Sequence, residues 1–223
     1  MSFNIAIDGP AGAGKSTIAR RVAKELSFLY VDTGALYRAI GLYLIRNGVS
    51  AEDEQALPEA CRQIHIDIAY ENGEQQVYLN EENVTGQIRT EEIGKMASAA
   101  AAKPCVRELL LNLQRDLAAR ADVLMDGRDI GTNILPGAQL KIYLTASVKT
   151  RARRRYLELV QKGDECVLEE IEKVIEERDY RDEHRDIAPL KKAEDAVLVD
   201  SSDMSIDQVV EQIIELYRQR RRG

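Results

Sequence analysis

The fold is decided by a glycine-rich stretch near the start of the chain, Gly9-Pro10-Ala11-Gly12-Ala13-Gly14-Lys15-Ser16. It fits the pattern GxxxxGK[ST] and joins an apolar run, Phe3–Asp8, to a segment with helical periodicity, Gly14–Leu26. The apolar run is typical of a buried parallel strand. A loop between such a strand and a helix presents backbone N–H groups to phosphate, next to the positive end of the helix dipole.

Two side chains in this stretch indicate a nucleoside triphosphate. Lys15 is expected to reach the β- and γ-phosphates, and the Ser16 hydroxyl to bind Mg²⁺. The alternative, a glycine-rich turn that binds nothing, gives no reason for a lysine and a hydroxyl at these places. We therefore expect residues 9–17, ending with Thr17, to bind ATP. A GTPase switch is excluded because the sequence holds no NKxD segment.

Short strands alternate with helical segments along the rest of the chain, which predicts an α/β fold with a five-stranded parallel sheet flanked by helices. After the first strand, four more are expected, at Phe28–Val31, around Leu124 and Met125, at Leu140–Leu144 and at Ala196–Val199. One helix is expected over Thr33–Arg46, and another begins at the capping box Ser205–Gln208.

A different pattern interrupts this alternation. Apolar and polar residues alternate in Ile64–Tyr70, Asn72-Gly73 favours a tight turn, and Gln75–Leu79 returns. We expect a small antiparallel sheet inserted between parallel strands, with Val84 near its end.

Composition limits the partners. There are 31 basic and 38 acidic residues, a net charge of −7, which argues against a general nucleic-acid binder. The basic residues comprise 21 arginines and 10 lysines, and arginine is suited to bidentate contact with phosphate or carboxylate. The contrast predicts anion sites inside an acidic protein.

Compartment and metal content are also constrained. The start of the chain lacks the features of a signal peptide, and the longest uncharged run, Ile130–Leu140, is too short to span a membrane. Three widely spaced cysteines suggest free thiols in a reducing compartment. Two distant histidines exclude a zinc site. We expect a cytoplasmic protein with no membrane contact.

Charged residues follow the predicted strand ends, where open α/β sheets bind ligands. Asp32-Thr33-Gly34, with Arg38 one helical turn later, follows the second strand, and Asp126-Gly127-Arg128-Asp129 follows the third. The alternatives are a helix N-cap for Asp32, a surface charge for Arg38 and a simple turn at residues 126–129.

A predicted helix over residues 164–185 carries charges in line with its apolar stripe. Val167, Ile171 and Val174 continue at helical spacing as Arg178, Asp182 and Arg185. Charges on an inward face are costly unless they are paired or meet a ligand, so we expect this face to bind one. The alternative is a stripe that runs out into solvent with weak i,i+4 ion pairs. Of the preceding arginines at 151, 153, 154 and 155, one or two are expected to close over the triphosphate.

The sequence closely resembles the bacterial cytidylate kinase family of P-loop nucleoside monophosphate kinases over essentially its whole length. The segments that carry the resemblance are IDGPAGAGKST (Ile7–Thr17), DTGALYRA (Asp32–Ala39), TGQIRTEEI (Thr85–Ile93), VRELL (Val106–Leu110), DGRDIGT (Asp126–Thr132) and ERDYRDEHR (Glu177–Arg185). The combination of the last two with the glycine-rich loop is far more specific than the loop alone. The resemblance implies transfer of the ATP γ-phosphoryl group to CMP or dCMP with Mg²⁺.

The resemblance also implies roles for single residues. The phosphate of CMP would be held by Thr33, Arg38, Arg128 and Arg185, the cytosine by Ser98, Arg107 and Asp129, and the sugar by Arg178 and Asp182. The catalytic set would be Lys15, Arg128, Arg178 and Arg185. Asp8, Asp32 and Asp126 are unranked candidates for holding the water shell of Mg²⁺.

The chemistry of the base agrees with these implied roles. Cytosine presents an amine donor beside two acceptors, so a carboxylate and an arginine complement it. Uracil would place a carbonyl against the carboxylate of Asp129, and unpaired polar groups of this kind can discriminate by ~10⁴-fold.

We expect one P-loop kinase unit over residues 1–223, working as a monomer. Its core would comprise residues 1–35, 105–148 and 186–223, its acceptor-binding region with the β insert residues 36–104, and its lid with the following helix residues 149–185. Two alternatives remain: a P-loop kinase for a non-nucleotide metabolite, such as a shikimate-like acceptor, and an ATP-binding module without transfer activity.

Overall fold

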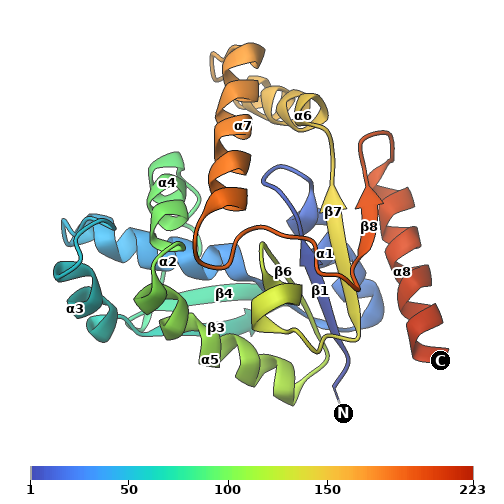
Figure 1. Ribbon diagram of the computed structural model, residues 1–223, viewed down its shortest axis with the longest axis horizontal. Helices are drawn as coiled ribbons and strands as arrows, with labels where there is room; N and C mark the ends of the chain where they lie inside the picture. Colours follow the sequence, from blue (N-terminus) through green and yellow to red (C-terminus); the bar gives the residue numbers. More distant parts are fainter. Residues whose placement is uncertain (1, 223) are drawn as a thin grey trace.

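The computed structural model describes residues 2–222 and contains two sheets (Figure 1). The larger sheet has five parallel strands in the order β2-β6-β1-β7-β8, as the sequence predicts. The strands are β1 (Asn4–Asp8), β2 (Leu29–Asp32), β6 (Val123–Gly127), β7 (Leu140–Thr145) and β8 (Val197–Asp200). Because all five run the same way, their carboxyl ends lie along one edge.

Helices cover both faces of this sheet. Successive side chains of a strand point to opposite faces, so Ile5 and Ile7 pack with one cluster while Ala6 packs with another. The first cluster receives α1 (Lys15–Leu26) and α8 (Ile206–Arg222), and the second receives α5 (Pro104–Arg120) and the short helix η1 (Ile130–Ile134). Both faces are therefore buried along β1 and β6, which is why these strands are nearly continuous apolar runs.

The predicted capping box is present at the start of α8. The backbone N–H of Ser205 donates to the Gln208 side chain at 2.8 Å, and the N–H of Gln208 donates to the Ser205 hydroxyl at 3.2 Å. These reciprocal bonds satisfy two donors that the first helical turn leaves open.

The smaller sheet lies beside α2 (Thr33–Arg46) and near α3 (Ala56–Gln63), with α4 (Glu91–Ala100) on the other side of α2, as Figure 1 shows. Its antiparallel strands are β3 (Ile66–Glu71), β4 (Glu74–Leu79) and β5 (Glu82–Asn83). The predicted turn is present: Asn72 and Gly73 both have positive φ, 54° and 79°, as a two-residue hairpin requires.

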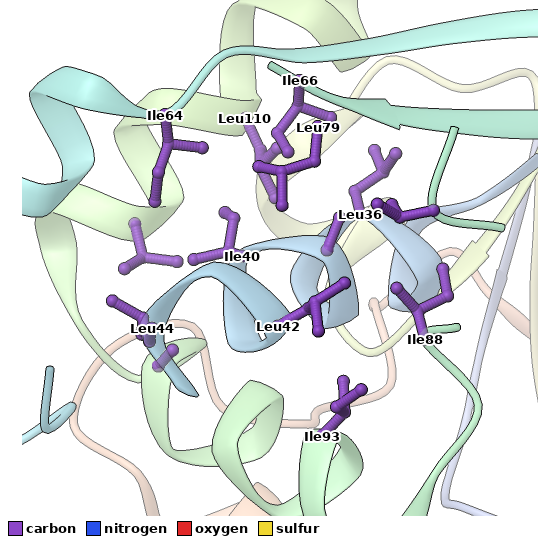
Figure 2. Packing of buried hydrophobic residues seen from close by; sticks show 14 of the residues in the cluster. Leu36, Ile40, Leu42, Leu44, Ile64, Ile66, Leu79, Ile88, Ile93 and Leu110 are labelled. Atoms are coloured by element: carbon purple, nitrogen blue, oxygen red, sulfur yellow. The ribbon is translucent and has the colours of Figure 1, made fainter. Parts of the chain in front are cut away.

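A separate hydrophobic cluster holds this region together. Ile40 of α2 lies on the side of that helix that faces Ile66 and Leu79 of the hairpin, with Leu36 and Leu44 on the same helix (Figure 2). All five side chains are buried. The antiparallel insert is thus packed directly on the helix that follows β2.

Two helices, α6 (Val148–Lys162) and α7 (Leu168–His184), extend from the carboxyl ends of the strands (Figure 1). The expectation of an inward apolar stripe on α7 was wrong for its first half, because Val167 is 50% exposed and Val174 is 57% exposed. This half projects beyond the sheet and has no core to meet. Arg178 and Asp182 in its second half, and Arg185 directly after the helix, line a cleft.

Among residues 2–222, we find no helix of the length and apolar character that crossing a membrane would require.

The cluster around α2 gives a stability prediction. Ile40→Ala should lower the free energy of unfolding by about 2–5 kcal/mol, because truncation leaves a cavity among fully buried side chains. Urea denaturation followed by circular dichroism measures the change. Leu198→Ala on the exposed side of β8 is the matched control, and it should change stability by under ~0.5 kcal/mol. Equal losses in both variants would contradict this packing.

Candidate active site

The glycine-rich loop between β1 and α1 is shaped by close contact with β7. A Cβ on Gly9 would lie 1.9 Å from the carbonyl oxygen of Leu144, and Gly9 has φ +150°, so only glycine fits. Gly14 caps α1 with positive φ and no side-chain bond, and the first turn of α1 holds no acidic residue. The open N–H groups at this helix start suit an anion.

The loop forms one wall of a cleft of about 710 Å³. Six of the nine residues predicted to bind ATP line it, namely Ala11, Gly12, Gly14, Lys15, Ser16 and Thr17. Gly9, Pro10 and Ala13 are buried and are not among the lining residues.

Lys15 is a buried cation within this loop. Its Nζ donates to the carbonyl oxygen of Pro10 at 2.8 Å. Burial, and after it the neighbouring positive charge of Arg128, lowers the pKa of Lys15 to about 7. A polyphosphate bound in the loop would place negative charge next to the Lys15 ammonium group and raise its pKa again.

The structure separates the three candidate acids for Mg²⁺. Asp126 accepts from the Ser16 hydroxyl at 3.0 Å and from the Tyr30 hydroxyl at 2.8 Å. Its pKa is raised, first by burial and then by the negative charge of Asp32. Among these acids, it is the one that contacts the loop hydroxyl.

The other two acids are engaged elsewhere. Asp8 accepts the backbone N–H groups of Ile130 and Gly131, each at 2.7 Å, and burial raises its pKa to about 6. Asp32 caps α2 through the N–H of Ala35 at 3.0 Å and also pairs with Arg89 at 2.8 Å. Asp32 is therefore the N-cap of α2, but not only that, because it also lines the cleft.

Residues after β2 and β6 form the opposite wall. The hydroxyl of Thr33 donates to the carbonyl oxygen of Asp126 at 2.8 Å. A Cβ on Gly127 would lie 2.7 Å from that hydroxyl, so the two strand ends approach closely only because this residue is glycine. Arg38 lines the cleft and donates to the carbonyl oxygens of Ile88 and Thr90, both at 3.1 Å.

A buried carboxylate lies at the far end of the cleft. Asp129 is 3% exposed and pairs with Arg107, and Arg185 donates to it at 3.5 Å. Arg107 also donates to Ala101 at 3.3 Å, and Arg185 to Ala188 at 2.7 Å. Both arginines are thus held by backbone oxygens as well as by Asp129. Ser98 lines the same region of the cleft, from α4.

The charges on α7 meet those after β6. Arg128 Nε donates to Asp182 at 2.8 Å, and Arg128 is the main neighbouring charge that lowers the pKa of Asp182 against the effect of burial. Arg178 is different, because its Nε is buried and has no hydrogen-bond partner within residues 2–222. Burial, then Arg128, lowers the pKa of Arg178 to about 10. The alternative of weak ion pairs within α7 is wrong, because Asp182 pairs with Arg128 from outside the helix and Arg178 Nε has no partner among the described residues.

Several cleft residues were missed by the sequence analysis. Tyr37 lies near Arg107, Asp129 and Arg185, whose charges act on its pKa, which burial raises to about 12. Arg89 also lines the cleft, where it forms an ion pair with Asp32. Tyr37 lies in the segment DTGALYRA and Arg89 in TGQIRTEEI. The two segments that carry the family resemblance therefore contained both residues, although neither was assigned a role.

The donor end of the cleft is bounded by α6 and α8. Of the four clustered arginines, Arg151, Arg154 and Arg155 line the cleft. Arg154 donates to the carbonyl oxygen of Ser201 at 2.7 Å. Apolar side chains of Met204, Ile206 and Val209 lie at the same end.

A loop shaped for a polyphosphate thus faces a second anion-binding region across one cleft, on a five-stranded parallel sheet. This combination defines a P-loop kinase.

Comparison with known proteins identifies the family within this class. A family model described as Cytidylate kinase matches residues 5–219. A cytidylate kinase from Listeria innocua is 50% identical over 217 residues, 97% of this chain and 96% of the relative. One from Lactobacillus johnsonii is 47% identical over 221 residues, 99% of this chain and 96% of the relative. The chain belongs to the cytidylate kinase family.

A solved structure of an uncharacterized protein from Eubacterium ventriosum shares the fold. It has a TM-score of 0.51 and 12% identity, over 96% of this chain and 98% of that one.

The buried lysine gives a prediction about protons. At pH 8 Lys15 is mostly neutral in the free protein because its pKa is about 7, whereas bound phosphate restores its charge. Binding of Mg-ATP at pH 8 should therefore take up roughly half a proton or more. Titration calorimetry in buffers of different ionisation enthalpy measures this uptake. Lys15→Met should abolish it; equal uptake by both proteins would contradict the assignment.

Proposed function

We propose that this protein transfers the γ-phosphoryl group of ATP to CMP or dCMP, giving ADP and CDP or dCDP. The observation that carries the proposal is Asp129, a buried carboxylate held between Arg107 and Arg185 at the end of the cleft away from the triphosphate loop. Membership of the cytidylate kinase family supports it.

The two ends of the cleft would hold the two nucleotides. ATP phosphates would lie in the loop around Lys15, and the acceptor phosphate would lie among Arg38, Arg128 and Arg185. Thr33 now gives its proton to a backbone carbonyl, so its hydroxyl must exchange that partner to donate to the acceptor phosphate. Arg178, whose buried Nε has no partner within residues 2–222, would neutralise charge on the transferred group.

The chemistry then consists of positioning and charge neutralisation. An oxygen of the CMP phosphate attacks the γ-phosphorus in line, and the bond to the β-phosphate oxygen breaks. No general base is required because the attacking oxygen is already anionic. Lys15, Arg128 and Arg178 stabilise charge on the three equatorial oxygens in a region shielded from water.

Family kinases use Mg²⁺ with ATP, and the residues present fit that ion. Mg²⁺ keeps several waters and binds one or two protein oxygens together with substrate phosphates. Within residues 2–222 no group of three or more His, Cys, Asp or Glu side chains forms a metal cage. Ser16 would ligate the ion directly, with Asp126 holding its water shell, and the ion would withdraw charge from the phosphates.

Base and sugar would be recognised by side chains already held in place. Asp129 would accept from the exocyclic amine of cytosine, while Arg107 donates to its ring acceptors. Ser98 would complete the base contacts, and Arg178 with Asp182 would contact the sugar. A deoxyribose fits the same two side chains, so dCMP should also be accepted.

We further propose that the chain acts as a monomer in the cytoplasm, without a nucleic-acid partner. The acidic balance supports the absence of a nucleic-acid partner, the free thiols at Cys61, Cys105 and Cys166 support the compartment, and the family resemblance suggests the monomer. Within the unit, residues 149–185 would act as a lid over residues 36–104 and the core.

The function itself is tested with a substrate panel. Purified protein with Mg-ATP should phosphorylate CMP and dCMP well and UMP or AMP poorly, measured by coupled ADP release. Preference for AMP, or for a non-nucleotide acceptor such as shikimate, would replace this proposal. ATP binding without turnover of any acceptor would indicate the non-catalytic module instead.

Recognition of the base gives a separate prediction. Asp129→Asn should narrow the ratio of kcat/KM for CMP over UMP by about 10-fold or more, because an amide also offers a donor to the uracil carbonyl. Asp203→Asn, an exposed position, is the matched control and should leave the ratio unchanged. An unchanged ratio in the Asp129 variant would remove this residue from base reading.

A further inference from the structure

Arg151 is a buried cation whose role the phosphoryl transfer leaves open. It lies in the first turn of α6 and is 3% exposed. Its Nε donates to the carbonyl oxygen of Ala146 at 2.8 Å, and Nη1 donates to that of Ala11 at 3.0 Å. The same Nη1 donates to Asp179 Oδ1 at 3.0 Å, and Nη2 donates to Asp179 Oδ2.

These partners belong to separate parts of the site. Ala11 is in the phosphate-binding loop, Ala146 follows β7, and Asp179 is on α7. The aliphatic part of Arg151 also supports the loop, because a Cβ on Gly12 would lie 3.5 Å from Arg151 Cβ. One side chain therefore contacts both the donor loop and the helix that lines the acceptor region.

Asp179 lies on α7 next to the residues that line the acceptor region. It directly follows Arg178, and it lies three residues before Asp182, which Arg128 holds. A helix fixes neighbouring residues relative to one another. The two-pronged pair with Arg151 thus sets the position of Arg178 and Asp182 relative to the loop, since a bidentate contact restricts orientation as well as distance.

The neighbouring arginines do not make this connection. Arg155 pairs with Glu158 on its own helix, in an exposed i,i+3 pair. Arg154 bonds to Ser201 after β8. Among the four clustered arginines, Arg151 alone has a hydrogen bond to both the donor loop and α7 within the described residues 2–222.

Burial makes this pair informative. A charge pair removed from water is weak support for stability alone, because desolvation offsets the attraction. The bidentate contact of Arg151 with Asp179, in contrast, restricts both distance and orientation. A displacement of the loop would therefore also displace α7.

We propose that Arg151 and Asp179 are positioning residues that couple the donor site to the acceptor site. Occupation of the loop by Mg-ATP strengthens binding of the acceptor nucleotide, and the acceptor strengthens ATP binding by the same factor. The inference rests on the proposed function for the identity of the acceptor.

The test compares Asp179→Asn and Arg151→Lys with the wild type. Asparagine removes the charge at nearly constant shape, and lysine keeps the charge but loses the fork. Lys162→Gln is the matched control, because it breaks an exposed pair with Glu158 on the same helix. Calorimetry gives the Kd of CMP alone and with a saturating non-hydrolysable Mg-ATP analogue, and steady-state kinetics give kcat.

In the wild type and the control, the analogue should tighten CMP binding about 5-fold or more. In both site variants this factor should fall to under about 2-fold and kcat should fall about 10-fold or more, while the Kd of each nucleotide alone changes less than about 3-fold.

Absence of coupling in the wild type would overturn the proposal, and so would an unchanged factor in Asp179→Asn. A lowered Tm with intact coupling would assign the pair a merely structural role and also overturn it. If Asp179→Asn does not fold, Arg151→Lys decides. If the panel selects another acceptor, the proposed function fails, and coupling is measured with that acceptor under the same criteria.

Discussion

The rest of the site depends on a group of buried cations at the carboxyl ends of the parallel strands. Burial lowers the pKa of Lys15 and of Arg178, and the positive charge of the nearby Arg128 lowers both further in the same direction. Such an arrangement is costly without negative charge. Asp182 and Asp126 supply part of it, and phosphate groups supply the remainder, so binding energy and catalytic stabilisation have one source.

The parallel sheet makes this group possible. Strand ends from β1, β2 and β6 are distant in sequence but adjacent along one edge, where α1 begins with open N–H groups. Close backbone approach at Gly9 and Gly127 brings the loops together. The protein can therefore be acidic as a whole, with a net charge of −7, and still enclose a cleft lined by arginines.

Packing outside the sheet determines the positions of the arginines that line the cleft. The antiparallel insert is packed on α2, which carries Arg38. The helices α6 and α7 extend away from the sheet, and Arg151 of α6 connects them to the phosphate-binding loop through Ala11. Each wall thus has its own packing, and the pairs Arg151–Asp179 and Arg128–Asp182 connect the walls to each other. A tight ligand would draw these walls together, because each wall already presents charge that lacks a full complement.

The sequence by itself determined the five parallel strands, the hairpin at Asn72-Gly73, and the loop that holds Lys15 and Ser16, because periodicity, turn chemistry and motif spacing are local properties. It did not rank Asp8, Asp32 and Asp126, and it placed Val174 inward although that side chain is exposed. Those questions depend on which groups meet across the cleft. Only the tertiary structure decided that Asp126 contacts Ser16 and that Arg151 meets Asp179, because partners 110 and 28 residues apart leave no periodic pattern in the chain.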